Sequence, residues 1–186
     1  MNFQKTEIPD VVIAEPRVFR DSRGFFMESF NAKKYEEAGI VGPFVQDNHS
    51  YSCKDTLRGL HAQREFPQGK LVRCVEGEIW DVAVDVRRGS PTFGKWVGVT
   101  LTAENCHQLW VPPGFVHGFC VLSATAQVEY KVTEYYHPED ELGVIWNDPT
   151  IAIDWPVKEP VLSQKDAESQ TLEEVMDLLP EFEATT

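Results

Sequence analysis

Hydrophobic and polar residues alternate along the chain in short runs that turn residues interrupt, which is the pattern of β-strands. The clearest run covers residues 78–86, where four side chains fall on one face and predict a half-buried strand: Trp80, Val82, Val84 and Val86. Further strands are predicted at residues 11–13, 17–19, 24–30, 44–52, 57–62, 70–75, 95–101, 107–111, 115–122 and 126–136. Many short strands with close turn signals predict a β-sandwich or barrel and not a parallel α/β sheet.

Two helices are also predicted. Asn31 can cap a helix over residues 32–38, with Gly39 at its end. Near the C-terminus, Thr171 and Glu174 form a capping box before apolar residues that share one helical face: Leu172, Val175, Leu178 and Leu179. We therefore expect a single domain over residues 1–186, in which residues 167–186 form a peripheral helical tail.

Composition narrows the functional classes. The 186 residues are 42% hydrophobic and 25% charged, which is ordinary for a globular protein. A net charge of −13 argues against a nucleic-acid partner, because such binding needs a positive surface. The sequence has neither an apolar run of membrane-spanning length nor a signal-like apolar start, so we expect no membrane partner and a cytoplasmic location.

Four cysteines are present, and none belongs to a CxxC pair: Cys53, Cys74, Cys106 and Cys120. Cys74 and Cys120 lie inside apolar runs, where a free thiol acts as a small hydrophobic group. Reduced, buried thiols are therefore expected in preference to disulfides or a zinc site.

Two segments resemble the metal-binding motifs of cupins with ligands removed. Residues 112–119 contain a PxGxxH turn that ends on His117, and residues 57–63 contain His61 where a cupin HxH motif would begin. The second histidine of that motif is replaced by Gln63, and the positions that would hold its glutamate are Pro67 and Gln68. Two histidines without a carboxylate or thiolate make a poor site for a divalent ion, so we expect no metal and no cofactor.

The remaining polar residues suit proton transfer next to a ketone. A neutral histidine has a pKa near 6.5 and can remove a proton at neutral pH. A lysine such as Lys70 can stabilise the enolate oxygen that then develops. A second group on the opposite face of the substrate must return the proton if the configuration of that carbon is to invert.

Seven ordered blocks between about residues 3 and 166 resemble the dTDP-4-dehydrorhamnose 3,5-epimerase family: residues 21–30, 44–50, 57–61, 68–73, 112–119, 130–131 and 153–156. The resemblance implies a double-stranded β-helix, the cupin jelly roll, with a few short peripheral helices. It also implies a homodimer in which N-terminal residues such as Arg23 and Glu28 reach the partner's site.

The resemblance assigns roles to individual residues. It makes His61 the general base, Asp166 the carboxylate that orients it, Lys70 the ligand of the C4 oxygen and Tyr130 the acid on the opposite face. Arg23 and Arg58 would bind the diphosphate, for which the guanidinium fork is well suited. The other residues expected to line the nucleotide-sugar site are Glu28, Gln46, Asp47, Asn48, His117, Glu141 and Lys165.

The implied reaction is epimerisation of dTDP-4-dehydro-6-deoxy-D-glucose at C3 and C5, which yields dTDP-4-dehydro-L-rhamnose for dTDP-L-rhamnose synthesis. Three alternatives remain open from the sequence: an epimerase acting at C3 only or on a related sugar, a metal-dependent cupin oxygenase, and a sugar-nucleotide binding module without activity. Tyr130 also fits a structural role, because it lies in an alternating strand where a core tyrosine would be ordinary.

Overall fold

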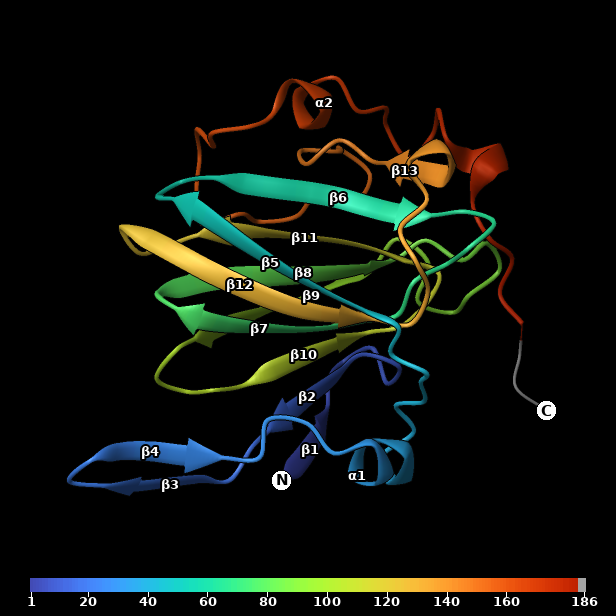
Figure 1. Cartoon of the computed structure of the whole chain (residues 1–186). Coiled ribbons are helices and arrows are strands. Elements are labelled where there is room, and N and C mark those ends of the chain that lie inside the picture. Colours follow the sequence, from blue (N-terminus) through green and yellow to red (C-terminus); the bar gives the residue numbers. More distant parts are fainter. Residues whose placement is uncertain (184–186) are drawn as a thin grey trace.

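Two antiparallel sheets lie face to face in the computed structural model, which describes residues 1–183 (Figure 1). The six-stranded sheet has the order β1 (Asn2–Lys5), β2 (Val12–Glu15), β10 (Gln108–Val111), β7 (Lys70–Glu76), β12 (Thr125–Val132) and β5 (Gln46–Cys53). The five-stranded sheet has the order β13 (Glu141–Gly143), β6 (Leu57–Gln63), β11 (Phe115–Val121), β8 (Glu78–Asp85) and β9 (Trp96–Thr102). A separate hairpin of β3 (Val18–Asp21) and β4 (Gly24–Met27) projects away from both sheets (Figure 1).

The chain passes repeatedly from one sheet to the other between β5 and β12, so strands that follow each other in sequence often lie in opposite sheets. This topology is a double-stranded β-helix, and the predicted jelly roll is confirmed. No helix among residues 1–183 is long and apolar enough to cross a membrane.

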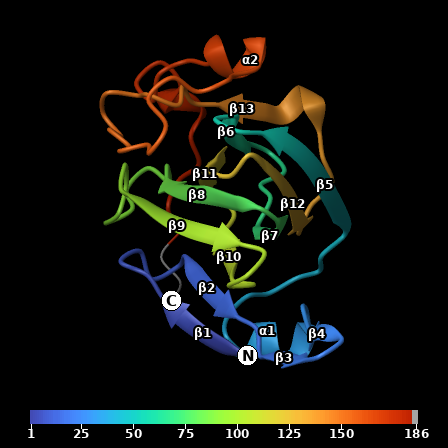
Figure 2. The same cartoon turned by 90° about the vertical axis from the view of Figure 1, so that its left-hand side faces the viewer.

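Apolar side chains form three layers around the sheets. One cluster fills the space between them, with Val72, Leu109 and Phe119 among its buried members. A second covers the outer face of the five-stranded sheet, where residues 142–179 pack over β6, β8 and β11. A third joins the outer face of the six-stranded sheet to helix α1 (Ala32–Glu37). Figure 2 shows β1 to β4 and α1 on one side of the two sheets and α2 (Gln164–Ala167) on the other.

Strand β8 is buried on both faces, so the prediction of a half-buried strand was wrong. Ile79 and Ala83 pack between the sheets, whereas Val82 and Val84 pack under the C-terminal segment. The alternation in sequence correctly identified one apolar face. It could not reveal that residues far along the chain return to cover the other face.

The first predicted helix is confirmed, because the Asn31 side chain accepts a hydrogen bond from the Lys34 amide at the start of α1. The second predicted helix forms only in part. The capping box is made, since Glu174 accepts from the Thr171 amide at 2.8 Å, but the chain continues only as a turn and the short 3₁₀ helix η2 (Met176–Leu178). Pro180 follows too soon for a longer helix to form. The predicted tail extends to Thr186, and residues 184–186 lie outside the described part of the chain.

Two strands and two short helices were not predicted from the sequence. Strands β1 and β13 were not predicted, because β1 is largely exposed and β13 has only three residues, so neither carries a clear apolar alternation. The short helices α2 (Gln164–Ala167) and η1 (Pro138–Asp140) were not predicted either.

All four cysteines are free thiols, and three are buried as expected, but Cys53 at the end of β5 is exposed.

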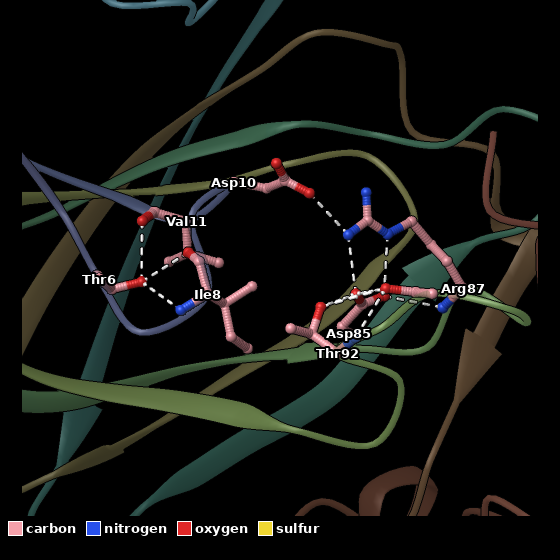
Figure 3. Close-up of polar contacts among 8 residues, drawn as sticks. Thr6, Ile8, Asp10, Val11, Asp85, Arg87 and Thr92 are labelled. Carbon is pink, nitrogen blue, oxygen red and sulfur yellow. Dashed lines mark hydrogen bonds and ion pairs between the residues drawn. The ribbon is translucent and has the colours of Figure 1, made fainter. Parts of the chain in front are cut away.

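A polar cluster ties the N-terminal loop to the turn that follows β8 (Figure 3). The Asp85 carboxylate is fully buried and accepts hydrogen bonds from Arg87, Ser90 and Thr92 at 2.6–2.9 Å. Arg87 also donates to Asp10 at 2.8 Å. The cluster therefore connects the first residues of the chain to the five-stranded sheet through one guanidinium group.

Candidate active site

An irregularity in β6 places Arg58 and His61 on the same side of the strand. The pairing of β6 with β11 shifts register, so that Gly59 and Leu60 together lie opposite Gly118. Gly59 has φ +122°, and a Cβ atom there would lie 2.6 Å from the Gly118 Cα atom. Because of this bulge, Arg58 and His61 both face the pocket, although their spacing of three would otherwise place them on opposite faces of a strand.

A pocket opens between the two sheets near this bulge. It brings together these residues of the predicted site: Gln46, Asn48, Arg58, His61, Lys70, His117, Tyr130, Glu141, Lys165 and Asp166. His61 and His117 are direct neighbours across β6 and β11 in the five-stranded sheet, whereas Tyr130 and Lys70 come from the six-stranded sheet. The two sheets therefore supply opposite walls of the pocket.

His61 and Asp166 form a hydrogen-bonded pair, with 2.6 Å between His61 Nε2 and Asp166 Oδ1. Asp166 lies in α2, where Ser163 caps the helix and donates its hydroxyl to the carboxylate at 2.8 Å. Burial alone would raise the pKa of Asp166, but the hydrogen bonds from His61 and Ser163 outweigh it and lower the pKa. The carboxylate thus stays charged at neutral pH and orients the imidazole. Ser163 was missed in the sequence, although its position three residues before Asp166 is a helix-cap signature.

Lys70 begins β7 and is buried, and its ammonium group donates to the backbone oxygen of His61 at 3.1 Å. Burial lowers the pKa of Lys70 to about 8, and the charges of Glu141 and Asp81 only partly oppose this shift. The Lys70 side chain is therefore positively charged at pH 7, and it lies next to His61, the predicted base.

The Tyr130 side chain lies on the inner face of β12. Burial raises the pKa of its hydroxyl, and the positive charge of Arg58 opposes that rise only in part. Tyr130 therefore keeps its proton at neutral pH and can act as a donor. Arg58 itself is held by Ser52 Oγ at 3.0 Å and by the backbone oxygen of Tyr51 at 3.3 Å.

His117 makes a second pair of the same kind, with 2.9 Å between its Nε2 and Asp81 Oδ1. Asp81 is fully buried in β8, and its Oδ2 atom has no hydrogen-bond partner among residues 1–183. The sequence showed Asp81 only as a polar residue within an apolar strand, so its link to His117 was missed.

The mouth of the pocket carries a network centred on Glu141. Lys165 forms an ion pair with Glu141, and the Tyr136 hydroxyl donates to the same carboxylate at 2.9 Å. Burial would raise the pKa of Glu141, but these two hydrogen bonds and the nearby His61 lower it. Tyr136 lines the pocket and was missed in the sequence, where it carries no motif.

Three residues of the predicted site lie outside this pocket. Arg23 is at the tip of the β3–β4 hairpin, 88% exposed, and pairs with Asp21 at 2.6 Å. Glu28 pairs with Lys34 at 2.5 Å, beside α1. Asp47 points to the outer face of β5, where it pairs with Lys131 at 2.9 Å. Within one subunit, these side chains do not join the others.

The donor set of the pocket does not resemble a metal site. Within residues 1–183, no three His, Cys, Asp or Glu side chains are grouped closely enough to hold a metal ion. Each pocket histidine is instead hydrogen-bonded to its own carboxylate, Asp166 or Asp81. A metal-free reaction remains the prediction.

Comparison with known proteins agrees with this geometry. The family model described as dTDP-4-dehydrorhamnose 3,5-epimerase matches residues 5–174. A protein of that name from Shigella flexneri is 62% identical over 172 residues, which cover 91% of this chain and 95% of the relative. A crystal structure of dTDP-6-deoxy-D-glucose-3,5-epimerase from Legionella pneumophila, in complex with dTDP-4-keto-L-rhamnose, superposes with a TM-score of 0.96 at 54% identity, and the match covers 98% of this chain and 99% of that one. The chain therefore belongs to the dTDP-4-dehydrorhamnose 3,5-epimerase family.

Proposed function

We propose that this chain epimerises dTDP-4-dehydro-6-deoxy-D-glucose at C3 and C5 and so produces dTDP-4-dehydro-L-rhamnose, as a step in dTDP-L-rhamnose synthesis. The observation that carries the proposal is the pairing of His61 with Asp166 on one wall of the pocket and Tyr130 on the other. Inversion needs a base and an acid on opposite faces of the sugar ring, and the two sheets supply one each.

Each inversion is a proton removal followed by a proton return. His61 takes the proton from the carbon next to the C4 ketone, and Asp166 stabilises the imidazolium that forms. The Lys70 ammonium group stabilises the enolate oxygen at C4. Tyr130 then donates its proton from the opposite side. C3 and C5 both flank the ketone, so the same residues serve both centres after exchange with solvent has removed the proton from His61 and returned one to Tyr130, and no redox cofactor is required.

The cationic residues of the pocket suit the diphosphate of the substrate. Arg58 is positioned by Ser52 and Tyr51 with its guanidinium group at the pocket, and Lys165 lies at the mouth. Gln46, Asn48, His117 and Glu141 are proposed to line the nucleotide-sugar site with them.

We also propose a single domain and a homodimer in the cytoplasm, with Arg23 and Glu28 contributing to the partner's site. The hairpin that carries Arg23 projects from the sheets and exposes three aromatic side chains: Phe19, Phe25 and Phe26. An exposed apolar hairpin of this kind is unusual on a monomer, so we propose that a second copy of the chain packs against it. Asp47 lies at the outer face of β5 and is proposed to bind substrate only in that assembly.

Proton NMR of dTDP-4-dehydro-6-deoxy-D-glucose with the purified protein in deuterated water tests this function. We expect deuterium at both C3 and C5 and the appearance of the L-rhamno product. Incorporation at C3 alone would indicate a single-site epimerase, and no incorporation at either centre would contradict the proposal. The same assay after exhaustive chelation tests the metal-free reaction, because loss of turnover that one divalent ion restores would overturn it.

A further inference from the structure

Gln63 occupies the last position of β6, where a cupin metal site would have its second histidine. The residue is only 5% exposed, and its amide group makes three hydrogen bonds to the backbone of two different loops. Nε2 donates to the Phe66 oxygen at 2.7 Å and to the Tyr135 oxygen at 3.1 Å, while Oε1 accepts from the His137 amide at 2.8 Å. Both amide hydrogens and the carbonyl oxygen are therefore engaged.

The two loops, residues 64–69 and 133–140, are joined by further contacts. The Asp140 carboxylate accepts from the backbone amides of Glu65 and Phe66 at 2.9–3.0 Å. The Phe66 ring stacks on His137 with 4.2 Å between ring centroids. Gln63 differs from Asp140 because its side chain comes from β6, the strand that also carries His61.

The segment that Gln63 holds forms part of the pocket wall. Tyr136 lies between Tyr135 and His137, whose backbones Gln63 binds, and its own amide donates to Gln46 Oε1 at 3.2 Å. Its hydroxyl donates to Glu141, the centre of the network at the pocket mouth. The two glutamines thus fix three successive residues of the loop, and the Tyr136 ring is placed over the pocket.

We propose that Gln63 is a positioning residue of the active site, whose buried amide holds residues 64–69 and 133–140 together and so fixes the pocket wall formed by Tyr136 and Glu141. The inference rests on the proposed function only for the identity of the substrate. Loss of the amide leaves the Phe66 and Tyr135 oxygens and the His137 amide without their partner, and a buried group left unpaired is costly. The loops then separate from β6, while His61, Lys70 and Tyr130 keep their places on paired strands.

Gln63→Met tests the proposal, because methionine has a similar length and no amide. We expect amide hydrogen exchange to speed up in residues 64–69 and 133–140, and KM for dTDP-4-dehydro-6-deoxy-D-glucose to rise about tenfold, equivalent to roughly 1.4 kcal/mol of binding. The fall in kcat should be less than about threefold, since the proton-transfer groups lie on the strands. Gln127→Met is the matched control, because Gln127 is a glutamine of β12 whose amide donates to the carboxylate of Glu76 away from the pocket.

A rise in KM confined to Gln63→Met, with faster exchange confined to the two loops, supports the proposal. Unchanged KM, or a fall in kcat at constant KM, overturns it. If Gln63→Met does not fold, Asp140→Asn weakens the contact of the same two loops at the Glu65 and Phe66 amides and should give the same exchange pattern with a smaller rise in KM. Faster exchange with unchanged KM in that variant would also overturn it. Lack of epimerase activity in the unaltered protein would instead refute the proposed function, and the exchange of the loops would still report on the amide.

Discussion

Burial and hydrogen-bond partners shift the pKa values of Asp166, Tyr130 and Lys70 in the pocket. Asp166 is held as a carboxylate by the hydrogen bonds from His61 and Ser163, although burial acts against it. Burial works in the other direction for Tyr130, whose pKa it raises, and for Lys70, whose pKa it lowers to about 8. One pocket thus contains an oriented imidazole, a protonated phenol and a cation at neutral pH, which is the set that epimerisation requires.

Separate variants should divide proton removal from inversion. His61→Ala should reduce deuterium uptake at both C3 and C5 by roughly 10²–10⁴-fold, the usual effect of losing a general base. Tyr130→Phe keeps the ring and its packing but removes the proton donor, so exchange from the His61 side should continue while inverted product becomes rare. Proton NMR in deuterated water measures both quantities.

The two variants also have distinct contradictory outcomes. Normal exchange in His61→Ala would remove His61 as the base, and His117, its cross-strand neighbour, would become the candidate. Inversion of both centres at the unaltered rate in Tyr130→Phe would show that Tyr130 is only a packing residue.

The depressed pKa of Lys70 predicts an alkaline limit on activity. As the pH rises through about 8, the ammonium group loses its proton and can no longer stabilise the enolate, so kcat should decline above that pH. Tyr130 does not explain a decline there, because its pKa is raised. A kcat profile between about pH 6 and 10 measures the limit, and Lys70→Arg should move it upward because a guanidinium stays charged. A flat profile to pH 10 would exclude this role.

Strand β6 shows how an element can depart from the pattern that identifies it. Alternation predicted a strand over residues 57–62, and the motif within it supplied Arg58 and His61 as candidates. Regular alternation would have separated these two side chains, and only the bulge opposite Gly118 directs both into the pocket. The sequence contained the residues and the strand, but the register shift depends on the partner strand, which a local pattern does not contain.

Gly59→Ala tests the importance of that bulge. The backbone at Gly59 has φ +122°, and the added methyl group would lie 2.6 Å from the Gly118 Cα atom, so both strain and contact oppose it. We expect a loss of stability of about 1–3 kcal/mol and a fall in kcat, because the bulge that aims His61 must change. Urea unfolding and steady-state kinetics measure the two effects. The matched control is Gly89→Ala, at a positive-φ turn where an added methyl group meets nothing within 4 Å, so only backbone strain is added. Equal losses of activity in both variants would show that the bulge is not special.

The whole molecule supplies what no segment can. Asp166 reaches His61 across 105 residues of sequence, and the segment that carries it also covers the outer face of β8. Apolar alternation predicted most strands and a β-sandwich or barrel, while the family resemblance specified the jelly roll and identified Asp166. The second buried face of β8, the Asp81 partner of His117 and the separation of Arg23 from the pocket depend on how distant segments meet. The local pattern therefore predicted the strands that form the pocket walls, but not the residues from distant segments that pack against these strands or bind their side chains.

The cluster of Asp10, Asp85 and Arg87 predicts how stability depends on pH. Burial would raise the pKa of Asp85, but hydrogen bonds from Arg87, Ser90 and Thr92 outweigh it and lower the pKa (Figure 3). A carboxyl group with a depressed folded pKa contributes stability that is fully present above its unfolded pKa, about 3.9, and is lost as the pH falls through the folded value. The Asp85 contribution should therefore be complete at pH 7 and disappear only in acid.

Arg87→Met isolates this contribution. Removing the guanidinium leaves the Asp85 carboxylate buried with only hydroxyl and backbone donors, so we expect a loss of about 3–5 kcal/mol at pH 7. Without Arg87 the folded pKa of Asp85 rises, and the variant can protonate the buried carboxyl group at a pH where the unaltered protein cannot. The stability gap between the two proteins should therefore narrow as the pH falls from 7 toward 4. Urea unfolding at several pH values measures the gap.

The control is Lys158→Met, which removes an exposed pair with Asp154 and should leave stability within roughly 0.5 kcal/mol at every pH. A gap for Arg87→Met that stays constant with pH would mean that lost packing against Phe115, and not the charge on Asp85, accounts for the destabilisation.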